Sequence, residues 1–124
     1  MEYQKLSNEF VFFVARNIIK QFINLTPHTL NIIKADGSTI DIQPSGDIAR
    51  VSSTSTVVAT FKGINISQQI FGEVIDLPDT KDGIIYIVSR MVKDRVPDRA
   101  DVLVPGAPVR DSEGRIIGAN GLSL

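Results

Sequence analysis

The chain lacks cysteine and has a single histidine among its 124 residues. Without cysteine it can form no disulfide bonds, thiolate nucleophile or zinc-finger site. One histidine also excludes the usual multi-histidine metal sites, although a carboxylate-only site for Mg²⁺ or Ca²⁺ stays open. We therefore expect no cofactor, and the absence of cysteine is compatible with a reducing, cytoplasmic location.

An excess of one charge is missing as well. The chain has 13 Lys and Arg against 14 Asp and Glu, with no long run of one sign. A general nucleic-acid binder needs a basic face, so this class is not expected. The apolar N-terminal stretch "NEFVFFVARNIIKQF" contains Arg16 and Lys20. They interrupt it before the roughly 20 apolar residues that a membrane span needs, so we expect no membrane partner.

Apolar residues recur at helical spacing near the N-terminus: Val11, Val14, Ala15, Ile18, Ile19 and Phe22. This pattern predicts an amphipathic helix over 7–22, capped by Ser7 or Asn8, with a short strand over 9–15 as the alternative. Three phenylalanines widen the apolar face: Phe10, Phe12 and Phe13. The helix is expected to pack on its own sheet or on a second subunit of a homo-oligomer.

From Ile23 onward, short runs rich in β-branched residues alternate with turn signals. Hairpin turns are indicated at Asp36-Gly37, Lys62-Gly63 and Gly114, and a type II turn at Pro105-Gly106. The most apolar run, "GIIYIVSRMV", is typical of a central strand, and "SRMVKDRVPDRAD" of a short helical turn.

These signals predict a mainly β (α+β) fold in two parts. An N-terminal helical extension, 1–22, precedes a single β-rich domain, 23–124. That domain is expected to be a compact antiparallel barrel or sandwich of about seven to nine short strands. Parallel βαβ architecture is not expected, because no helix-period segments separate the strands.

No catalytic signature is present. His28 is the only imidazole base, and Ser45 lies in "PSGD", which is not a nucleophile elbow. Glycine-rich nucleotide motifs are also missing. Asp98, Asp101 and Asp111 are close enough in sequence to form a magnesium site, but turns in general are rich in Asp. We therefore do not expect an enzyme.

Polar residues near turns are the candidates for ligand binding. Pro27 removes a backbone donor and would hold His28 on a rigid, interrupted strand. The Ser45 and Gly46 amides can form an anion-binding turn, and Arg50 can bind a phosphate in a bidentate way. The full candidate set is His28, Ser45, Gly46, Arg50, Ser89, Arg90, Arg99, Asp101 and Arg110.

A structural explanation of the same residues stays open. Arginines that flank strands are mostly solvated or ion-paired, and His28 can be a hydrogen-bonded packing residue. In that case Asp101 would neutralise Arg99, and Asp111 would neutralise Arg110.

An ordered set of motifs carries a resemblance: "NLTPH", "PSGDIAR", "YIVS", "RADVLVPGAPVRD" and "GRIIG". In order and spacing it resembles a family of small, largely uncharacterised proteins from phages and conjugative elements, over residues 23–118. The matching positions are Asn24, Thr26, Pro27, His28, Pro44, Ser45, Gly46, Arg50, Ser89, Asp101, Pro105, Gly106, Arg110 and Asp111. The resemblance implies that the helix over 7–22 is an addition to the family's domain, and it implies no established activity.

Two functional hypotheses follow, beside a third, enzymatic one that rests only on His28 and the aspartates. In the first, the protein binds a small phosphorylated or nucleotide-type ligand, sequestering a host immune signal, with Tyr86 or Phe71 stacked on a base. In the second, it is a structural or protein-interaction protein, such as a virion accessory subunit or an inhibitor of a host protein. Its interface would be the phenylalanine-rich helix, helped by an exposed strand edge at Pro27.

Overall fold

The computed structural model describes residues 19–124, so most of the helix predicted over 7–22 lies outside the described residues. The predicted C-terminal boundary of that helix is wrong. Gln21 and Phe22 belong to the first strand, β1 (Gln21–Asn24), because they hydrogen-bond in parallel to a buried strand further along the chain. Pairing with this strand outweighs the helical spacing of the apolar residues.

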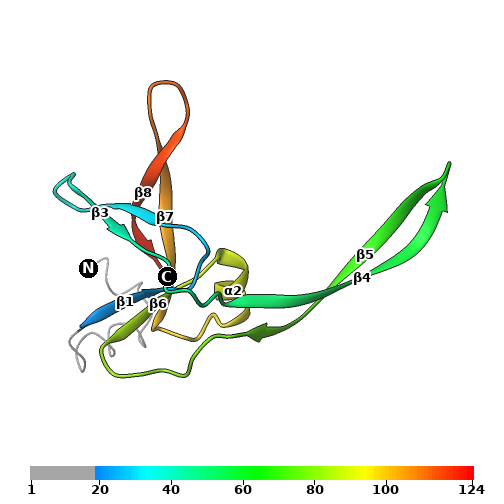
Figure 1. Ribbon diagram of the computed structural model, residues 1–124, viewed down its shortest axis with the longest axis horizontal. Coiled ribbons are helices and arrows are strands. Elements are labelled where there is room, and N and C mark those ends of the chain that lie inside the picture. The colour runs from blue at the N-terminus through cyan, green and yellow to red at the C-terminus, as the bar shows by residue number, and fades with distance from the viewer. Residues whose placement is uncertain (1–18) are drawn as a thin grey trace, which may run out of the picture.

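Six strands form the body of the molecule, in the spatial order β1-β6-β7-β8-β2-β3 (Figure 1). The other five are β2 (Leu30–Ile33), β3 (Thr39–Ile42), β6 (Ile84–Ile87), β7 (Val102–Arg110) and β8 (Ile116–Ser123). An isolated bridge between Asn24 and Pro44 links the end of β1 to the segment after β3, so the sheet is nearly closed. The prediction of a mainly β, barrel-like fold is confirmed, and the described chain has eight strands in all.

The sheet is mixed, which corrects the expectation of an antiparallel one. β1 pairs with β6, β6 with β7, and β2 with β8 in parallel. Parallel neighbours need a crossover of a dozen or more residues. Segment 88–101 supplies it for β6 and β7, and it contains the helix α2 (Arg90–Arg95). A helix of six residues is too short to leave a clear period in the sequence, although the helical turn itself was predicted.

The core lies where β6 and β7 pack beneath α2. Ile85, Tyr86, Ile87 and Val88 are at most 1% exposed, which confirms that "GIIYIV" is a buried strand. The side chains that complete this cluster are Leu25, Ala49, Val92, Val102 and Val104.

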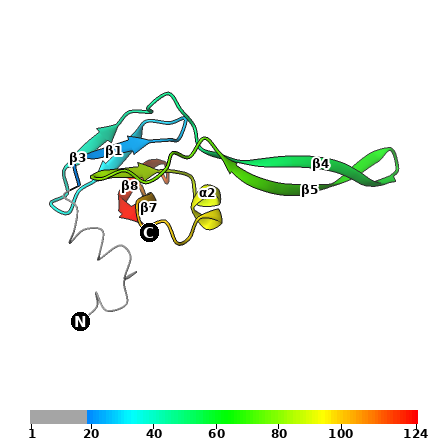
Figure 2. The ribbon, with the colours of Figure 1, turned by 90° about the horizontal axis from the view of Figure 1, so that it is seen from below.

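A long hairpin leaves this body. Strands β4 (Arg50–Phe61) and β5 (Ile64–Ile75) pair only with each other among the described strands. They extend well away from the rest of the molecule in both views (Figures 1 and 2). Lys62 and Gly63 close the hairpin with φ of 51° and 77°, as a two-residue turn requires. We call this β4–β5 hairpin the arm.

Most predicted turns are confirmed. Gly37 has a φ of 87° between β2 and β3, and Gly114 has a φ of 83° between β7 and β8. The turn predicted at Pro105-Gly106 is wrong, because both residues lie inside β7. There the chain passes so close to β8 that a Cβ on Gly106 would lie 2.1 Å from the Asn120 carbonyl oxygen. Glycine is needed for this close approach, and no reversal of the chain occurs.

Candidate functional site

The break at Thr26-Pro27-His28 is held by the buried side chain of Asn24. Its amide nitrogen donates to the backbone oxygens of His28 at 2.7 Å and Ile42 at 3.1 Å. Its oxygen accepts from the backbone nitrogen of Thr26 at 2.9 Å and from the Thr26 hydroxyl at 2.7 Å. Three of these bonds fasten the chain as it passes from β1 to β2, and the bond to Ile42 ties it to the end of β3. The stretch therefore has a structural explanation, and His28 itself is exposed.

Arg99 and Asp101 form a bidentate ion pair, with Nε–Oδ1 and Nη2–Oδ2 both at 2.8 Å. Asp101 is 2% exposed, and Arg99 also donates to the Pro78 carbonyl at 2.9 Å. Burial opposes ionisation of Asp101, but the hydrogen bond and charge of Arg99 outweigh it and hold the pKa of Asp101 below its usual value. The suggestion that Asp101 neutralises Arg99 is confirmed, so this arginine is already engaged inside the fold.

Several other candidates have local partners. Arg50 forms an exposed ion pair with Asp76 at 3.2 Å, and Arg110 donates to the Gly114 carbonyl at 2.7 Å within its own hairpin. The Ser45 hydroxyl donates to the Asp47 carbonyl at 3.3 Å. These contacts stabilise turns or strand ends, and Asp111 pairs with Arg115 instead of Arg110.

The two aromatic candidates for base stacking differ in exposure. Tyr86 is 1% exposed, and its hydroxyl donates to the Asp79 carbonyl at 3.3 Å. Phe71 lies on the arm, 38% exposed, with the Arg95 guanidinium 5.8 Å from its ring centre. A ligand therefore has access to Phe71 and not to Tyr86.

The predicted site residues do not gather in one place. Arg50 and Ser89 line one groove, and Arg90 lines a second cavity. The others line neither of these: His28, Ser45, Gly46, Arg99, Asp101 and Arg110. Within residues 19–124 there is also no group of three His, Asp or Glu side chains that could hold a metal ion.

The arm exposes many apolar side chains. Seven of its large apolar side chains are 38–66% exposed: Val57, Val58, Phe61, Ile64, Ile66, Ile70 and Phe71. Between 51 and 72 the only charged residue is Lys62, at the turn. Exposed apolar surface of this kind is typical of interaction sites.

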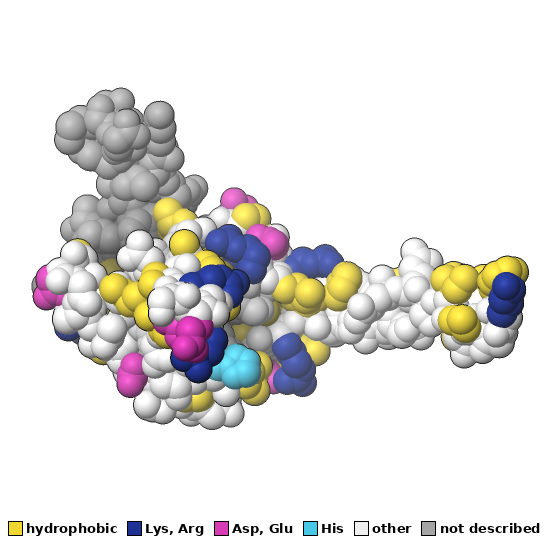
Figure 3. All heavy atoms as spheres, turned by 90° about the horizontal axis from the view of Figure 1, so that it is seen from above, with side chains coloured by type: hydrophobic (Ala, Val, Ile, Leu, Met, Phe, Trp, Pro, Cys, Tyr) yellow, Lys and Arg dark blue, Asp and Glu magenta, His cyan; other side chains and the backbone are white. Residues whose placement is uncertain are grey.

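Apolar and polar side chains are ordered along the arm. The arm tip carries Val57, Val58, Phe61, Ile64 and Ile66, and the middle of β4 is the hydroxyl run 52–56. Figure 3 shows the same order on one face, with apolar side chains at the tip, an uncharged polar stretch, and apolar side chains again near the body.

An apolar groove lies at the foot of the arm. We call it the foot groove, with a volume of about 250 Å³. Its lining residues are Leu25, Thr26, Pro27, Ile48, Ala49, Arg50, Val51, Ser89 and Met91. The Ala49 nitrogen donates to the Leu25 carbonyl at 3.0 Å, which fixes the groove to the body. Ile48 and Met91 are 39% and 52% exposed, so the groove offers open apolar surface.

Sequence reasoning missed the arm as a site, although a signal was present. The strand of a domain with one buried face alternates apolar and polar residues, whereas "VSSTSTV" has a hydroxyl side chain at every position between two valines. A twelve-residue strand with this composition has no face to bury in its own core.

No protein-family model, curated protein or solved structure matches the chain. No helix among residues 19–124 is long and apolar enough to cross a membrane.

Proposed function

We propose that this protein is a non-catalytic assembly protein that joins to another protein chain through its arm. The observation that carries the proposal is a hairpin with twelve residues in each strand, an exposed apolar tip, and a stretch from 53 to 73 in which every residue is exposed in the described chain. In the setting that the resemblance implies, a phage or conjugative element, it would be a virion accessory subunit or an inhibitor of a host protein.

Energetics favour a covered arm. An isolated two-stranded hairpin is only marginally stable in water, and a third strand or a packed layer is usually needed. Full burial of one large apolar side chain contributes about 1.5–3 kcal/mol. Because the seven side chains are about half exposed, covering them would contribute on the order of 5–10 kcal/mol in total.

The composition of the arm narrows the class of partner. A nucleic acid would require several cationic side chains along the arm, and the stretch 51–72 has only Lys62. Hydroxyl and amide side chains beside an unpaired strand edge suit pairing with another β-strand.

Two isoleucine variants test the proposal. Ile64 is 66% exposed at the arm tip, and Ile116 is 60% exposed on the body. In sedimentation velocity we expect the full chain to associate, Ile64→Ser to weaken association at least about 10-fold, and Ile116→Ser to leave it unchanged. Equal weakening of association by Ile64→Ser and Ile116→Ser would contradict the arm as the interface, and a chain that stays a monomer at every concentration would exclude the self-assembling forms of the proposal.

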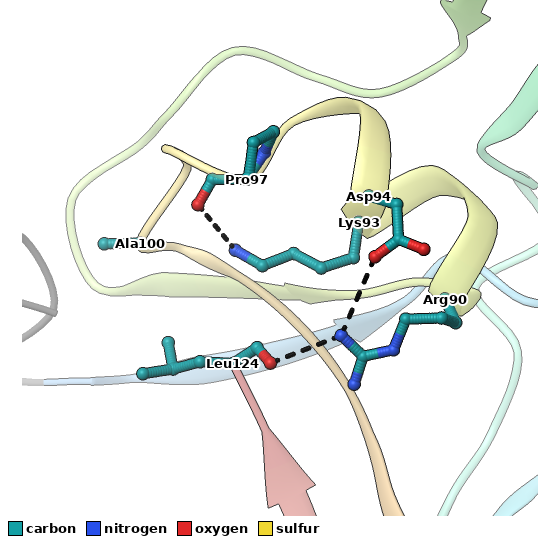
Figure 4. A pocket seen from close by; sticks show the side chains of 6 residues that line it. All are labelled: Arg90, Lys93, Asp94, Pro97, Ala100 and Leu124. Atoms are coloured by element: carbon teal, nitrogen blue, oxygen red, sulfur yellow. Dashed lines mark hydrogen bonds and ion pairs between the residues drawn. The ribbon is translucent and has the colours of Figure 1, made fainter. Parts of the chain in front are cut away.

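A second candidate, binding of a small anion, is favoured by one cavity beside α2. Arg90, Lys93, Asp94, Pro97, Ala100 and Leu124 line it, and its volume is about 220 Å³ (Figure 4). Lys93 is 6% exposed and burial lowers its pKa, while its Nζ donates to the Arg99 carbonyl at 2.8 Å. Two cationic side chains facing one cavity match a phosphate group.

Thermal shift separates this candidate from the assembly role. Nucleotides or pyrophosphate at about 100 times Kd should stabilise the fold by about 2.7 kcal/mol. The gain should vanish in Arg90→Ala and persist in Arg110→Ala, whose guanidinium lies in the β7–β8 hairpin. No shift with any of these anions would exclude the ligand-binding candidate and leave the assembly role untouched.

A further inference from the structure

We propose that the partner of the arm is a second copy of this chain, and that two arms pair side by side and antiparallel about a two-fold axis. Each tip would then lie in the foot groove of the other copy. The inference rests on the proposed assembly function and adds the identity of the partner and the geometry of the contact.

The first argument is the order of residues along β4 and the segment before it. Apolar side chains occupy 48, 49 and 51, hydroxyl side chains occupy 52–56, and apolar side chains return at 57–59 and 61. In the run Val51-Ser-Ser-Thr-Ser-Thr-Val57 the order of apolar and hydroxyl side chains is the same in both directions about Thr54. When two such strands run antiparallel with Thr54 at the axis, valine faces valine and hydroxyl faces hydroxyl. A two-fold interface requires this kind of self-complementarity.

The second argument is the free edge. β4 pairs with β5 on one side and with no other described strand on its outer side. Pairing two β4 strands through these edges would turn two marginal hairpins into one four-stranded antiparallel sheet. With Thr54 at the axis the overlap runs from 48 to 60, which spans about 40 Å at the usual rise per residue and carries each tip to the other foot.

The third argument is the fit between tip and foot groove. The tip presents Phe61 and Ile64, 65% and 66% exposed, and the foot groove exposes Ile48 and Met91. With Thr54 at the axis, Phe61 of one copy comes level with the start of the foot groove of the other. The arm cannot fold back onto its own foot groove, because it extends away from the body (Figures 1 and 2). Both surfaces are therefore open within residues 19–124.

Charge agrees with this arrangement. With Thr54 at the axis, residues 51–57 of the two copies face each other and are uncharged. Residues 58–61 are also uncharged and face 47–50, which contains Asp47 and Arg50, so no like charges meet. A second copy presents the same uncharged stretch, so the two facing surfaces match in charge without any further requirement.

Engineered cysteines test the geometry directly, because the chain has no cysteine of its own. Thr54→Cys and Thr60→Cys change two exposed threonines of the same strand. The purified full chain carrying Thr54→Cys should oxidise to a covalent dimer at least about 10-fold faster than Thr60→Cys, since only position 54 meets its own copy.

A mixing experiment tests the contact between tip and foot groove. Ile48→Cys and Thr60→Cys should each give few dimers alone, and should cross-link when the two variants are mixed, because positions 48 and 60 lie equally far from Thr54. Thr60→Cys cross-linking as fast as Thr54→Cys would indicate a tip-to-tip contact and overturn the inference. Chains that associate in sedimentation while no cysteine pair cross-links would overturn the geometry but keep the second copy as partner. A monomer throughout would overturn the inference and leave the arm to a chain of a different kind.

Discussion

The body and the arm differ in how much of their side-chain surface is buried. In the body, four successive residues of the β6 region are at most 1% exposed, and no buried side-chain nitrogen or oxygen of residues 19–124 lacks a hydrogen-bond partner. Along the arm, every side chain from Ser53 to Glu73 is exposed. The body is therefore complete as a monomer, whereas the arm has the backbone pairing of a sheet without the burial that normally stabilises one.

This contrast separates the buried part of the chain from its exposed part. Under the proposed assembly role, a change in the body acts on the fold of one chain, and a change in the arm acts on contact between chains. Loops and exposed elements on a rigid scaffold commonly carry function for this reason. The following pairs of variants compare the two regions with matched chemistry.

The largest difference is expected between two ion pairs. Asp101→Ala leaves Arg99 without its buried partner and should lower the free energy of unfolding by about 3–5 kcal/mol. Asp76→Ala removes the exposed pair with Arg50 at the foot of the arm and should change it by less than about 1 kcal/mol. Urea unfolding followed by circular dichroism measures both, and equal losses would contradict the contrast.

Two isoleucine-to-threonine changes make the same comparison for apolar contacts. Ile85 is 0% exposed, and Ile85→Thr should destabilise by about 2–4 kcal/mol, because it removes packing and buries a hydroxyl. Ile70→Thr, at a 55% exposed arm position, should alter unfolding of the monomer by no more than about 0.5 kcal/mol. Unfolding at a concentration that prevents association is the measurement, and a large loss in Ile70→Thr would show that the arm packs within its own chain.

The pH dependence of the free energy of unfolding should arise in the body, from Asp101. Because the pKa of Asp101 is lower in the folded chain, its contribution is present above the unfolded pKa of about 3.9 and is lost as the pH falls toward the folded value. The difference in unfolding free energy between the wild type and Asp101→Asn should therefore be largest above about pH 5 and shrink below about pH 4. A difference that stays constant down to pH 2 would show that ionised Asp101 is not what stabilises the pair.

Two turn glycines give the smallest expected effect. Gly37 and Gly63 both have positive φ, and a Cβ at either would lie in open space, so alanine adds only backbone strain. Gly37→Ala should lower global stability by about 1 kcal/mol, because its hairpin belongs to the body. Gly63→Ala should leave global stability unchanged and speed hydrogen exchange in the arm alone. An effect of Gly63→Ala on global unfolding would show that arm and body unfold together.

Local chemistry made part of the fold predictable. The Asp36-Gly37 turn, the Gly114 hairpin and the buried "GIIYIV" strand were confirmed, since each depends on a few adjacent residues. Strand order and the parallel pairing of β1, β6 and β7 depend on contacts between distant segments of the chain. The six residues of α2 are too few to produce the helical period from which a crossover is predicted. Pro105-Gly106 resembles a turn dipeptide, but its glycine is required by the approach of Asn120.

The candidate site shows a similar division. Pairing of Arg99 with Asp101 was suggested as a structural explanation and is confirmed, because two residues at i and i+2 meet readily. Convergence of the remaining candidates required a tertiary arrangement that sequence alone does not contain. The two strands of the arm were predicted from their composition. That they extend away from the body was not predicted, because it depends on which described strands they pair with.

Hydrogen exchange at several protein concentrations tests the central claim most directly. If the arm is an interface between two copies, amides of 50–61 should become protected as the concentration rises. Amides around the foot groove at 48–51 should follow the same concentration dependence, and those of β6 should stay equally protected throughout. Rapid exchange of the arm that does not change with concentration would contradict the account.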